Sequence, residues 1–274
     1  MAKERILIAV KTYPTLSNTY SELVCTAGFR QDGSWIRIYP APFRFLEKDS
    51  QYRKYDWIEL DVDKNPKDPR PESYRPRNID DITVVGHVGT GAKRDWQERR
   101  RLVLGKNTIH TNLHTVITAA KANEYSLVIF KPTEVTRLIV ESVNPEWELS
   151  RKQAAEAAAA QGSLFNENEQ RDFKLMPKLP YKFSYRFKDD AGKESTLMIE
   201  DWEIGQLYWA CLRKYDEATA VRKVEEKYFY DFAKTKDLYL FLGTTYEAHM
   251  RKFNNPYVII GTFHPTHVKQ PSLF

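Results

Sequence analysis

The sequence has few cysteines and no long apolar run. Its two cysteines, Cys25 and Cys211, lie far apart within apolar stretches, which excludes a disulfide framework and a paired-cysteine zinc motif. No apolar run is long enough to cross a bilayer, and no signal peptide precedes the apolar run after Arg5, so we expect a cytoplasmic protein without a membrane partner. Gly-rich phosphate loops of the Walker or dinucleotide type and a Gly-x-Ser-x-Gly elbow are also missing.

The composition is typical of a globular protein. Of the 274 residues, 42% are apolar and 29% are charged, which is enough for one large domain or two small ones. The net charge of +5 is unevenly placed, because 11 basic residues stand against 6 acidic ones between Lys64 and Lys106. A local basic surface suits an anionic partner such as nucleic acid, and a solvated loop and helix is the alternative interpretation.

Apolar runs and alternating patterns predict many strands and few helices. The expected strands are Ile6–Val10, a hairpin of Leu23–Phe29 and Trp35–Tyr39, Tyr55–Asp63, Ile82–Val88, a pair of Leu127–Phe130 and Val135–Val143, Tyr181–Phe187, Leu238–Leu242 and Tyr257–Phe263. The expected helices are a short one near Pro42–Lys48, then Lys93–Leu104, Thr111–Lys121, Ser150–Gln161 with Ser150 as N-cap, and one opened by Asp201. Strands and helices do not alternate regularly, so we predict an α+β fold with a curved, mostly antiparallel sheet and several packed helices.

Composition also suggests three regions. Residues 1–149 form a β-rich region that handles nucleic acid, and the Pro-rich segment Asn65–Pro76 within it is expected to be an irregular loop. Residues 150–176 hold an Ala-rich helix and a flexible linker. Residues 177–274 form an α+β region that completes the same fold.

A polar, aromatic loop near the start of the chain runs directly into the expected hairpin. Loops anchored on rigid strands often carry binding and catalytic groups. Glu22 stands at a strand mouth with Lys11 and Tyr13 nearby, so we take these three as candidate catalytic residues; an ordinary exposed glutamate is the alternative. Tyr20 and Tyr39 are candidates for stacking on unpaired or flipped bases, with core packing as the alternative.

Arginines of the Pro-rich loop and of the following basic helix are candidates for binding DNA phosphates. Pro-stiffened arginines lose little entropy on binding, and a guanidinium matches phosphate oxygens. The candidate phosphate-binding residues are Arg44, Arg70, Arg75, Arg77, Lys93, Arg99 and Arg100.

Other patterns have weaker functional interpretations. Asp201 and Glu203 are second-choice catalytic carboxylates, because Asp is also a favoured N-cap and Glu in a first turn complements the helix dipole. The pairs His110/His114 and His264/His267 have spacings that fit a metal, yet no Cys cluster or Glu stands beside them, so we expect no metal. The segment Asp61–Lys64 is similar to a nuclease cluster, but on a strand Asp63 and Lys64 would face opposite sides.

Several blocks carry a resemblance to a known family. The first comprises K-T-Y-P, Y-S-E-L-V-C-T-A-G and D-G-S-W-I-R-I-Y-P-A-P-F-R near the start of the chain. Later blocks are P-Y-K-F-S-Y-R-F (180–187), E-D-W-E-I-G-Q-L-Y (200–208), and L-Y-L-F-L-G-T-T with P-Y-V-I-I-G-T-F (238–263). Together they resemble a family of largely uncharacterised bacterial proteins of phage-defence settings, and the nearest associated activity is that of defence DNA glycosylases that remove glucosylated hydroxymethylcytosine.

The resemblance implies a monofunctional DNA glycosylase, a hydrolase of N-glycosidic bonds, that removes a bulky modified cytosine from phage DNA in antiviral defence. The helix-hairpin-helix and Gly-Gln-Asp-Pro-Tyr motifs of common glycosylases are missing, so no catalytic residue is transferred from those groups. Chemically, the base would be extruded from the duplex, and Glu22 would stabilise the oxocarbenium-like sugar while orienting water, without a cofactor. The alternatives are a non-catalytic reader of modified DNA that recruits a nuclease, and an RNA-modifying or RNA-binding protein.

Overall fold

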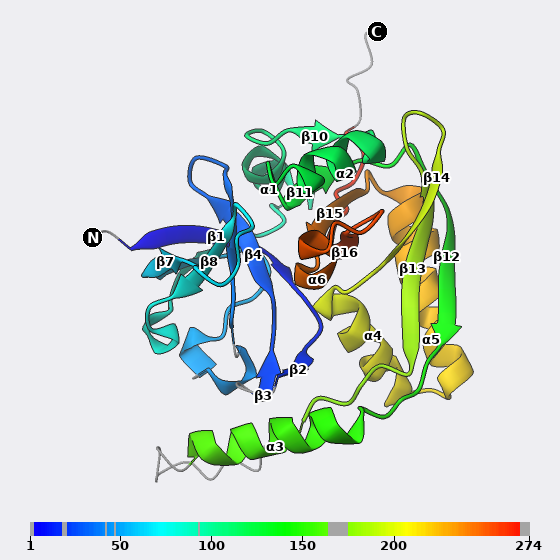
Figure 1. The fold of residues 1–274 in the computed structure, drawn as a ribbon. Coiled ribbons are helices and arrows are strands. Elements are labelled where there is room, and N and C mark those ends of the chain that lie inside the picture. Colours follow the sequence, from blue (N-terminus) through cyan, green and yellow to red (C-terminus); the bar gives the residue numbers. More distant parts are fainter. Residues whose placement is uncertain are drawn as a thin grey trace, which may run out of the picture.

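The computed structural model describes residues 3–17, 21–41, 43–46, 48–92, 94–163 and 175–268. Its strands are β1 (Glu4–Lys11), β2 (Thr15–Ser17), β3 (Ser21–Leu23), β4 (Thr26–Arg30), β5 (Trp35–Ile38), β6 (Asp56–Leu60), β7 (Val62–Lys64), β8 (Ser73–Pro76), β9 (Thr83–His87), β10 (Ile109–His110), β11 (Leu127–Phe130), β12 (Glu134–Ser142), β13 (Tyr181–Lys188), β14 (Glu194–Met198), β15 (Tyr239–Thr244) and β16 (Tyr257–Phe263). Its helices are α1 (Gln97–Val103), α2 (Leu113–Lys121), α3 (Leu149–Ser163), α4 (Trp202–Leu212), α5 (Glu217–Glu225) and α6 (Tyr246–Met250) (Figure 1).

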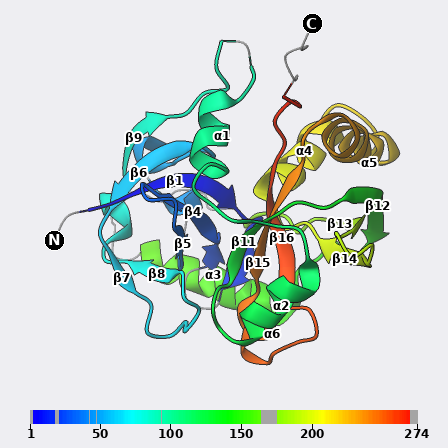
Figure 2. The same ribbon diagram turned by 90° about the horizontal axis from the view of Figure 1, so that it is seen from above.

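The N-terminal half is a seven-stranded sheet with the order β7-β8-β5-β4-β1-β6-β9. The sheet curls into a half-barrel, which is visible from above in Figure 2. Successive side chains of a strand point to opposite faces, so Ile6 and Ile8 of β1 enter the core inside the curl, whereas Leu7 and Ala9 enter a second core behind it. Because both faces of β1 are buried, its sequence is a continuous apolar run rather than an alternating one.

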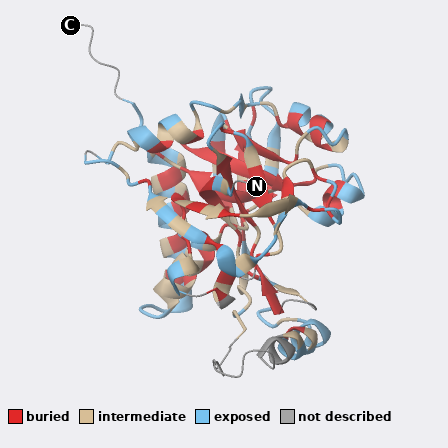
Figure 3. Cartoon of the chain, turned by 90° about the vertical axis from the view of Figure 1, so that its left-hand side faces the viewer, coloured by how far each residue is buried: buried red, intermediate tan, exposed pale blue. Residues whose placement is uncertain are grey.

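The C-terminal half contains two further sheets. One has the order β10-β11-β15-β16 and shares the core behind the half-barrel, where Phe29 of β4 meets Phe241 of β15. The other is the antiparallel sheet β12-β13-β14, whose buried face packs with α2, α4 and α5. Figure 3 shows that the buried residues concentrate on the strands at the centre of the molecule.

A buried polar contact joins the two halves. The Arg37 side chain is 1% exposed, and its Nη1 donates to Ser126 Oγ at 2.8 Å. The amide and hydroxyl of Ser126 in turn donate to the carboxylate of Glu72, at 2.9 and 2.7 Å for the nearest oxygens. Buried polar groups are costly unless they are hydrogen-bonded, so this chain of contacts ties β5 to the start of β11 in one relative position.

The predicted α+β class, with a curved and mostly antiparallel sheet and packed helices, is confirmed. The hairpin around Asp32-Gly33 is β4–β5, and Asp201 is the N-cap of α4. In the alternating segment Tyr181–Phe187, Phe183, Tyr185 and Phe187 are buried while Lys182 is exposed, as its pattern indicates. Among the described residues no helix is long and apolar enough to span a membrane.

Several local predictions differ from the structure. The expected strands Leu23–Phe29 and Tyr55–Asp63 are each divided, into β3 and β4 and into β6 and β7, and the helix expected from Lys93 begins at Gln97. The segment expected to be an irregular loop ends in β8, which pairs in parallel with β5. The strands β11 and β12 were expected to pair with each other, but they lie in different sheets, because each finds its partners in the C-terminal hairpins. The helix α3 begins at Leu149, so Ser150 lies inside the helix and is not its N-cap.

Candidate functional site

Glu22 lies at the centre of β3 and is closed off from solvent. Its side chain is 2% exposed, and Arg44 Nη1 donates to its two oxygens at 2.8 and 2.6 Å. The amide of Met176 donates to the same carboxylate. The helix α3 packs on the β2–β3 hairpin close by. Through these contacts the Glu22 carboxylate holds the chain before β13 against the β2–β3 hairpin.

Tyr13 joins the end of the N-terminal segment to α4. Its hydroxyl donates to Pro177 O at 2.8 Å and accepts from Trp209 Nε1 at 2.7 Å, and burial raises its pKa to about 12. Its ring lies against Gly205, where an added Cβ would be only 2.3 Å from Tyr13 Cδ2. The absence of a side chain at Gly205 therefore permits the close approach of Tyr13 to α4.

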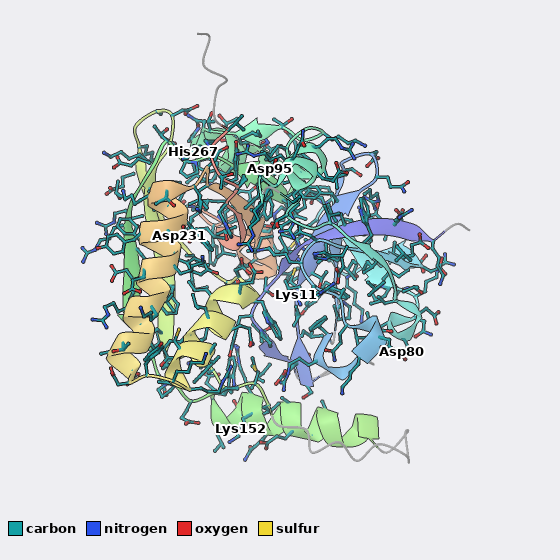
Figure 4. All side chains as sticks on the ribbon, turned by 180° about the vertical axis from the view of Figure 1, so that it is seen from behind. Lys11, Asp80, Asp95, Lys152, Asp231 and His267 are labelled. Carbon is teal, nitrogen blue, oxygen red and sulfur yellow. The ribbon has the colours of Figure 1, made fainter. Side chains whose placement is uncertain are left out.

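Beside this contact lies a group of four charged residues, Lys11, Lys54, Asp201 and Glu203, which we name the charged cluster. Lys54 is at its centre: its Nζ donates to Asp201 Oδ2 at 3.1 Å, to Glu203 Oε2 at 2.8 Å and to Thr262 O at 3.3 Å. Asp201 Oδ1 accepts from the amide of Glu203 at 3.1 Å, which caps α4. The cluster therefore forms where the half-barrel meets the first turn of α4. Figure 4 labels its member Lys11.

Burial gives the two carboxylates of the charged cluster different properties. Asp201 is 1% exposed, and burial raises its pKa to about 6, although the Lys54 charge acts in the opposite direction. Burial also acts to raise the pKa of Glu203, but the Lys54 ammonium outweighs it, so the net shift is downward. The Glu203 side chain is 49% exposed. Glu203 is consequently the carboxylate of this cluster that is both ionised near neutral pH and accessible to solvent.

Lys11, the last residue of β1, contributes a second amine. Its Nζ donates to Tyr52 O at 3.0 Å and lies 4.0 Å from the ring centroid of Phe43 and 5.3 Å from that of Trp202. Burial lowers the pKa of Lys11 to about 8; the nearby Glu203 charge opposes this shift and the Lys54 charge adds to it. Lys11 is only partly buried. The amine of a partly exposed lysine, with a lowered pKa, thus stands near an ionised carboxylate.

The segment from Tyr52 to Asp56 builds this arrangement. Tyr52 offers its carbonyl to Lys11, Lys54 enters the cluster, and Tyr55 packs under the guanidinium of Arg99 at 3.8 Å from the ring centroid. Tyr55 has a φ of 69°, which is unusual for a bulky residue and is held by hydrogen bonds from its amide to Ile8 O and from Val88 N to its carbonyl. Strained residues of this kind concentrate at functional sites.

The predicted phosphate-binding residues have different environments. Arg70 is buried and donates to both carboxylate oxygens of Asp68, at 2.8 and 2.5 Å, and to Thr244 O at 2.6 Å. Arg99 is buried as well, and Arg100 donates to Asp237 at 2.9 Å. In these positions the three guanidinium groups serve internal contacts.

Two of the predicted arginines lie on the surface. Arg75 of β8 is exposed, and the exposed Arg77 donates to Asp63 at 2.8 Å. Tyr39 is half-buried, and its carbonyl accepts from Asn65 Nδ2. Lys93 and Tyr20 lie outside the described residues.

The histidine pairs do not form a metal centre in the described part of the chain, where no group of three or more His, Cys, Asp or Glu residues is arranged around a common point. His110 is on β10 and His114 on α2. His264 stacks on Phe232 at a centroid distance of 3.5 Å, and burial lowers its pKa to about 3. His264 is therefore a neutral packing residue at ordinary pH.

Three members of the charged cluster were predicted from the sequence as candidate catalytic residues, but Lys54 was not. Lys11 was grouped with Glu22, and Asp201 with Glu203, whereas the structure brings Lys11 to the latter pair. Lys54 stands in a polar stretch typical of a surface loop, so no local pattern marks it as buried. Its aromatic neighbours Tyr52 and Tyr55 are the only local signal.

The molecule is thus an α+β protein with a charged cluster between its two halves. The chain belongs to the family described as Domain of unknown function (DUF8757), whose model matches residues 106–274, and the model of Domain of unknown function (DUF8758) matches residues 2–105. No curated protein matches it. A solved structure titled "Structure of murine DNA binding protein bound with ds DNA" is similar at a TM-score of 0.31 and 8% identity, covering 99% of this chain and 100% of that chain. A TM-score at that level does not define a common fold.

Proposed function

We propose that the protein acts on DNA as a glycosylase that removes a bulky modified cytosine, and that its reaction centre is the charged cluster. The observation that carries the proposal is Glu203, a half-exposed carboxylate kept ionised by the buried ammonium of Lys54 at 2.8 Å. Departure of a base leaves positive charge on the sugar, and a fixed carboxylate stabilises such a transition state. We assign to Glu203 the role that the sequence suggested for Glu22, because the Glu22 carboxylate is buried in an ion pair with Arg44.

The distribution of basic residues supports DNA as the substrate. The locally basic segment keeps several cationic side chains on the surface even though Arg70 and Arg99 are internal. Its exposed members among the described residues are Lys64, Lys67, Arg75, Arg77, Arg94, Arg101 and Lys106. Cationic side chains of this kind bind nucleic acid by releasing counterions. The resemblance to defence glycosylases supplies the modified phage cytosine as the base.

The test of the chemistry is abasic-site formation on a duplex that contains glucosylated hydroxymethylcytosine, with an unmodified duplex as the control. We expect Glu203→Gln to lower the single-turnover rate by about 10²–10³-fold, as is typical when one electrostatic stabiliser is removed, and to retain DNA binding. Glu22→Gln is the matched variant, which removes a carboxylate charge away from the cluster and is expected to keep its rate. Absence of abasic sites with the parent protein would reject the glycosylase, and preferential binding of the modified duplex would then identify a reader.

The test of the DNA interface is the salt dependence of binding. Replacing Arg75 and Arg77 by Ala should reduce the slope of log K against log salt by up to about 2, because each phosphate contact contributes about 0.9. Arg222→Ala, on α5 outside the basic segment, is the matched surface control, since Arg222 is exposed and paired with Glu226 as Arg77 is with Asp63. A slope equal to that of the parent protein would mean that Arg75 of β8 and the adjacent Arg77 do not contact DNA.

A further inference from the structure

We propose that the Lys11 amine is a nucleophile that forms an imine with the aldehyde of an abasic deoxyribose in DNA. The inference deepens the proposed function, because that aldehyde is the open form of the sugar that base removal leaves behind. It assigns Lys11 a covalent role that is separate from the electrostatic role of Glu203.

The contacts of Lys11 differ from those of Lys54 in a way that favours reactivity. Lys54 is 7% exposed and forms two ion pairs. Lys11 is partly exposed, and within the described ranges no carboxylate lies within ion-pair distance of its Nζ. Its Nζ donates instead to the carbonyl of Tyr52. The rings of Phe43 and Trp202 hold the amine in place while leaving its nitrogen without a carboxylate partner.

The electrostatics of the cluster support the same role. Burial and the Lys54 charge lower the pKa of Lys11 to about 8. At pH 7.5 about a quarter of such amines are neutral, compared with about 0.1% for an ordinary lysine, and only the neutral form is nucleophilic. The charges of Glu203 and Lys11 act on each other, so the ionised Glu203 would also stabilise the protonated imine.

The covalent step is a condensation that needs no oxidant or reductant. The lone pair of the Lys11 nitrogen forms a bond to C1′, the carbonyl electrons move to oxygen, and the two amine protons leave with that oxygen as water when the C=N bond forms. Protonation of the imine then acidifies C2′. Loss of a C2′ proton forms the C2′=C3′ bond and expels the 3′ phosphate with the C3′–O3′ electrons, which nicks the strand. Addition of water to the imine returns the amine.

The experiment uses a duplex that already contains one abasic site, together with borohydride, which reduces an imine to a stable amine. Parent protein should form a covalent adduct with DNA whose modified peptide contains Lys11, and the adduct yield should rise with pH around a midpoint of about 8. Lys11→Arg keeps the charge but is not nucleophilic under these conditions, so we expect at least a tenfold loss of adduct. Lys152→Arg, on the exposed face of α3, is the matched control and should trap as well as the parent.

Mapping the adduct in the parent protein decides the matter even if Lys11→Arg fails to fold. An adduct located at other lysines, or no adduct at all, would overturn the assignment. Because the abasic site is preformed, base removal is not needed: a protein that is trapped through Lys11 but releases no base refutes only the proposed glycosylase. A protein that releases base but is never trapped at Lys11 refutes only this inference.

Discussion

Replacing Lys54 by Met tests whether the charged cluster depends on one buried cation. Met retains most of the stem and removes the ammonium that lies 3.1 Å from Asp201 Oδ2. Asp201 is 1% exposed, so the change leaves a buried carboxylate without its cation. Removing one partner of a buried ion pair costs about 3–5 kcal/mol. We expect the free energy of unfolding at pH 7.5 to fall by about that amount.

The pH dependence of this deficit has a definite sign. Burial raises the pKa of Asp201 from 3.8 to about 6 with Lys54 present, and loss of Lys54 should raise it further. A carboxyl whose folded pKa exceeds its unfolded value stabilises the fold at low pH, and this contribution is lost as the pH rises through the folded pKa. Lys54 lowers the pKa of Glu203 in the folded parent protein. Ionised Glu203 therefore stabilises the parent fold above about pH 4.5, and this stabilisation is lost as the pH falls. The deficit of Lys54→Met should therefore shrink toward pH 5 and grow toward pH 7.5, by at most about 1.4 kcal/mol per pH unit for each group.

The assay is urea unfolding at pH 5.0 and 7.5, followed by tryptophan fluorescence. Lys152→Met, which removes an exposed lysine of α3, is the control and should lose little at either pH. Adding Asp201→Asn to Lys54→Met should recover much of the lost stability, since the uncompensated charge is then gone. A deficit that is equal at both pH values, with no recovery in the double variant, would refute the electrostatic account of the cluster.

Three further changes test neighbouring contacts by the same urea measurement. Gly205→Ala should lower the free energy of unfolding by about 1–3 kcal/mol, because the added methyl group overpacks against Tyr13. Unchanged stability would mean that the Tyr13 ring does not lie against Gly205. Tyr13→Phe should cost about 1–3 kcal/mol because the Trp209 indole loses its acceptor; unchanged stability would mean that water replaces the hydroxyl. Asp201→Ser keeps an N-cap for α4 but removes the ion pair with Lys54. The loss of stability should therefore exceed the about 1 kcal/mol that a missing N-cap costs, and unchanged stability would mean that Asp201 acts only as an N-cap.

The elements that were predicted well from the sequence are those whose local residue pattern indicates which of their faces are buried. Ile6–Val10 is apolar on both faces, and the structure buries both faces of β1. The alternation of Tyr181–Phe187 indicates a strand with one apolar face, and the structure buries Phe183, Tyr185 and Phe187 of β13. In contrast, β8 is four residues long and lies among prolines, so its parallel pairing depends on β5 having an open edge.

The candidate site was only partly predictable, because its charges are buried by distant parts of the chain. Lys54 meets Asp201 across 147 positions, and no local pattern records such a contact. Glu22 was expected in solvent or in a reaction site, yet the chain near Met176 covers it from 154 positions away. For Asp201 the N-cap role could be predicted from one turn of sequence, whereas its ion pair with the distant Lys54 could not.

The charged cluster crosses the boundary between the two family models. Lys11 and Lys54 come from the part matched by one model, and Asp201 and Glu203 from the part matched by the other. Neither part alone contains both the amines and the carboxylates. A chain cut after residue 105 should therefore behave as a pair of complementary fragments that regain the cluster only on reassembly, and an ancestor that carried one part without the other would have lacked the site.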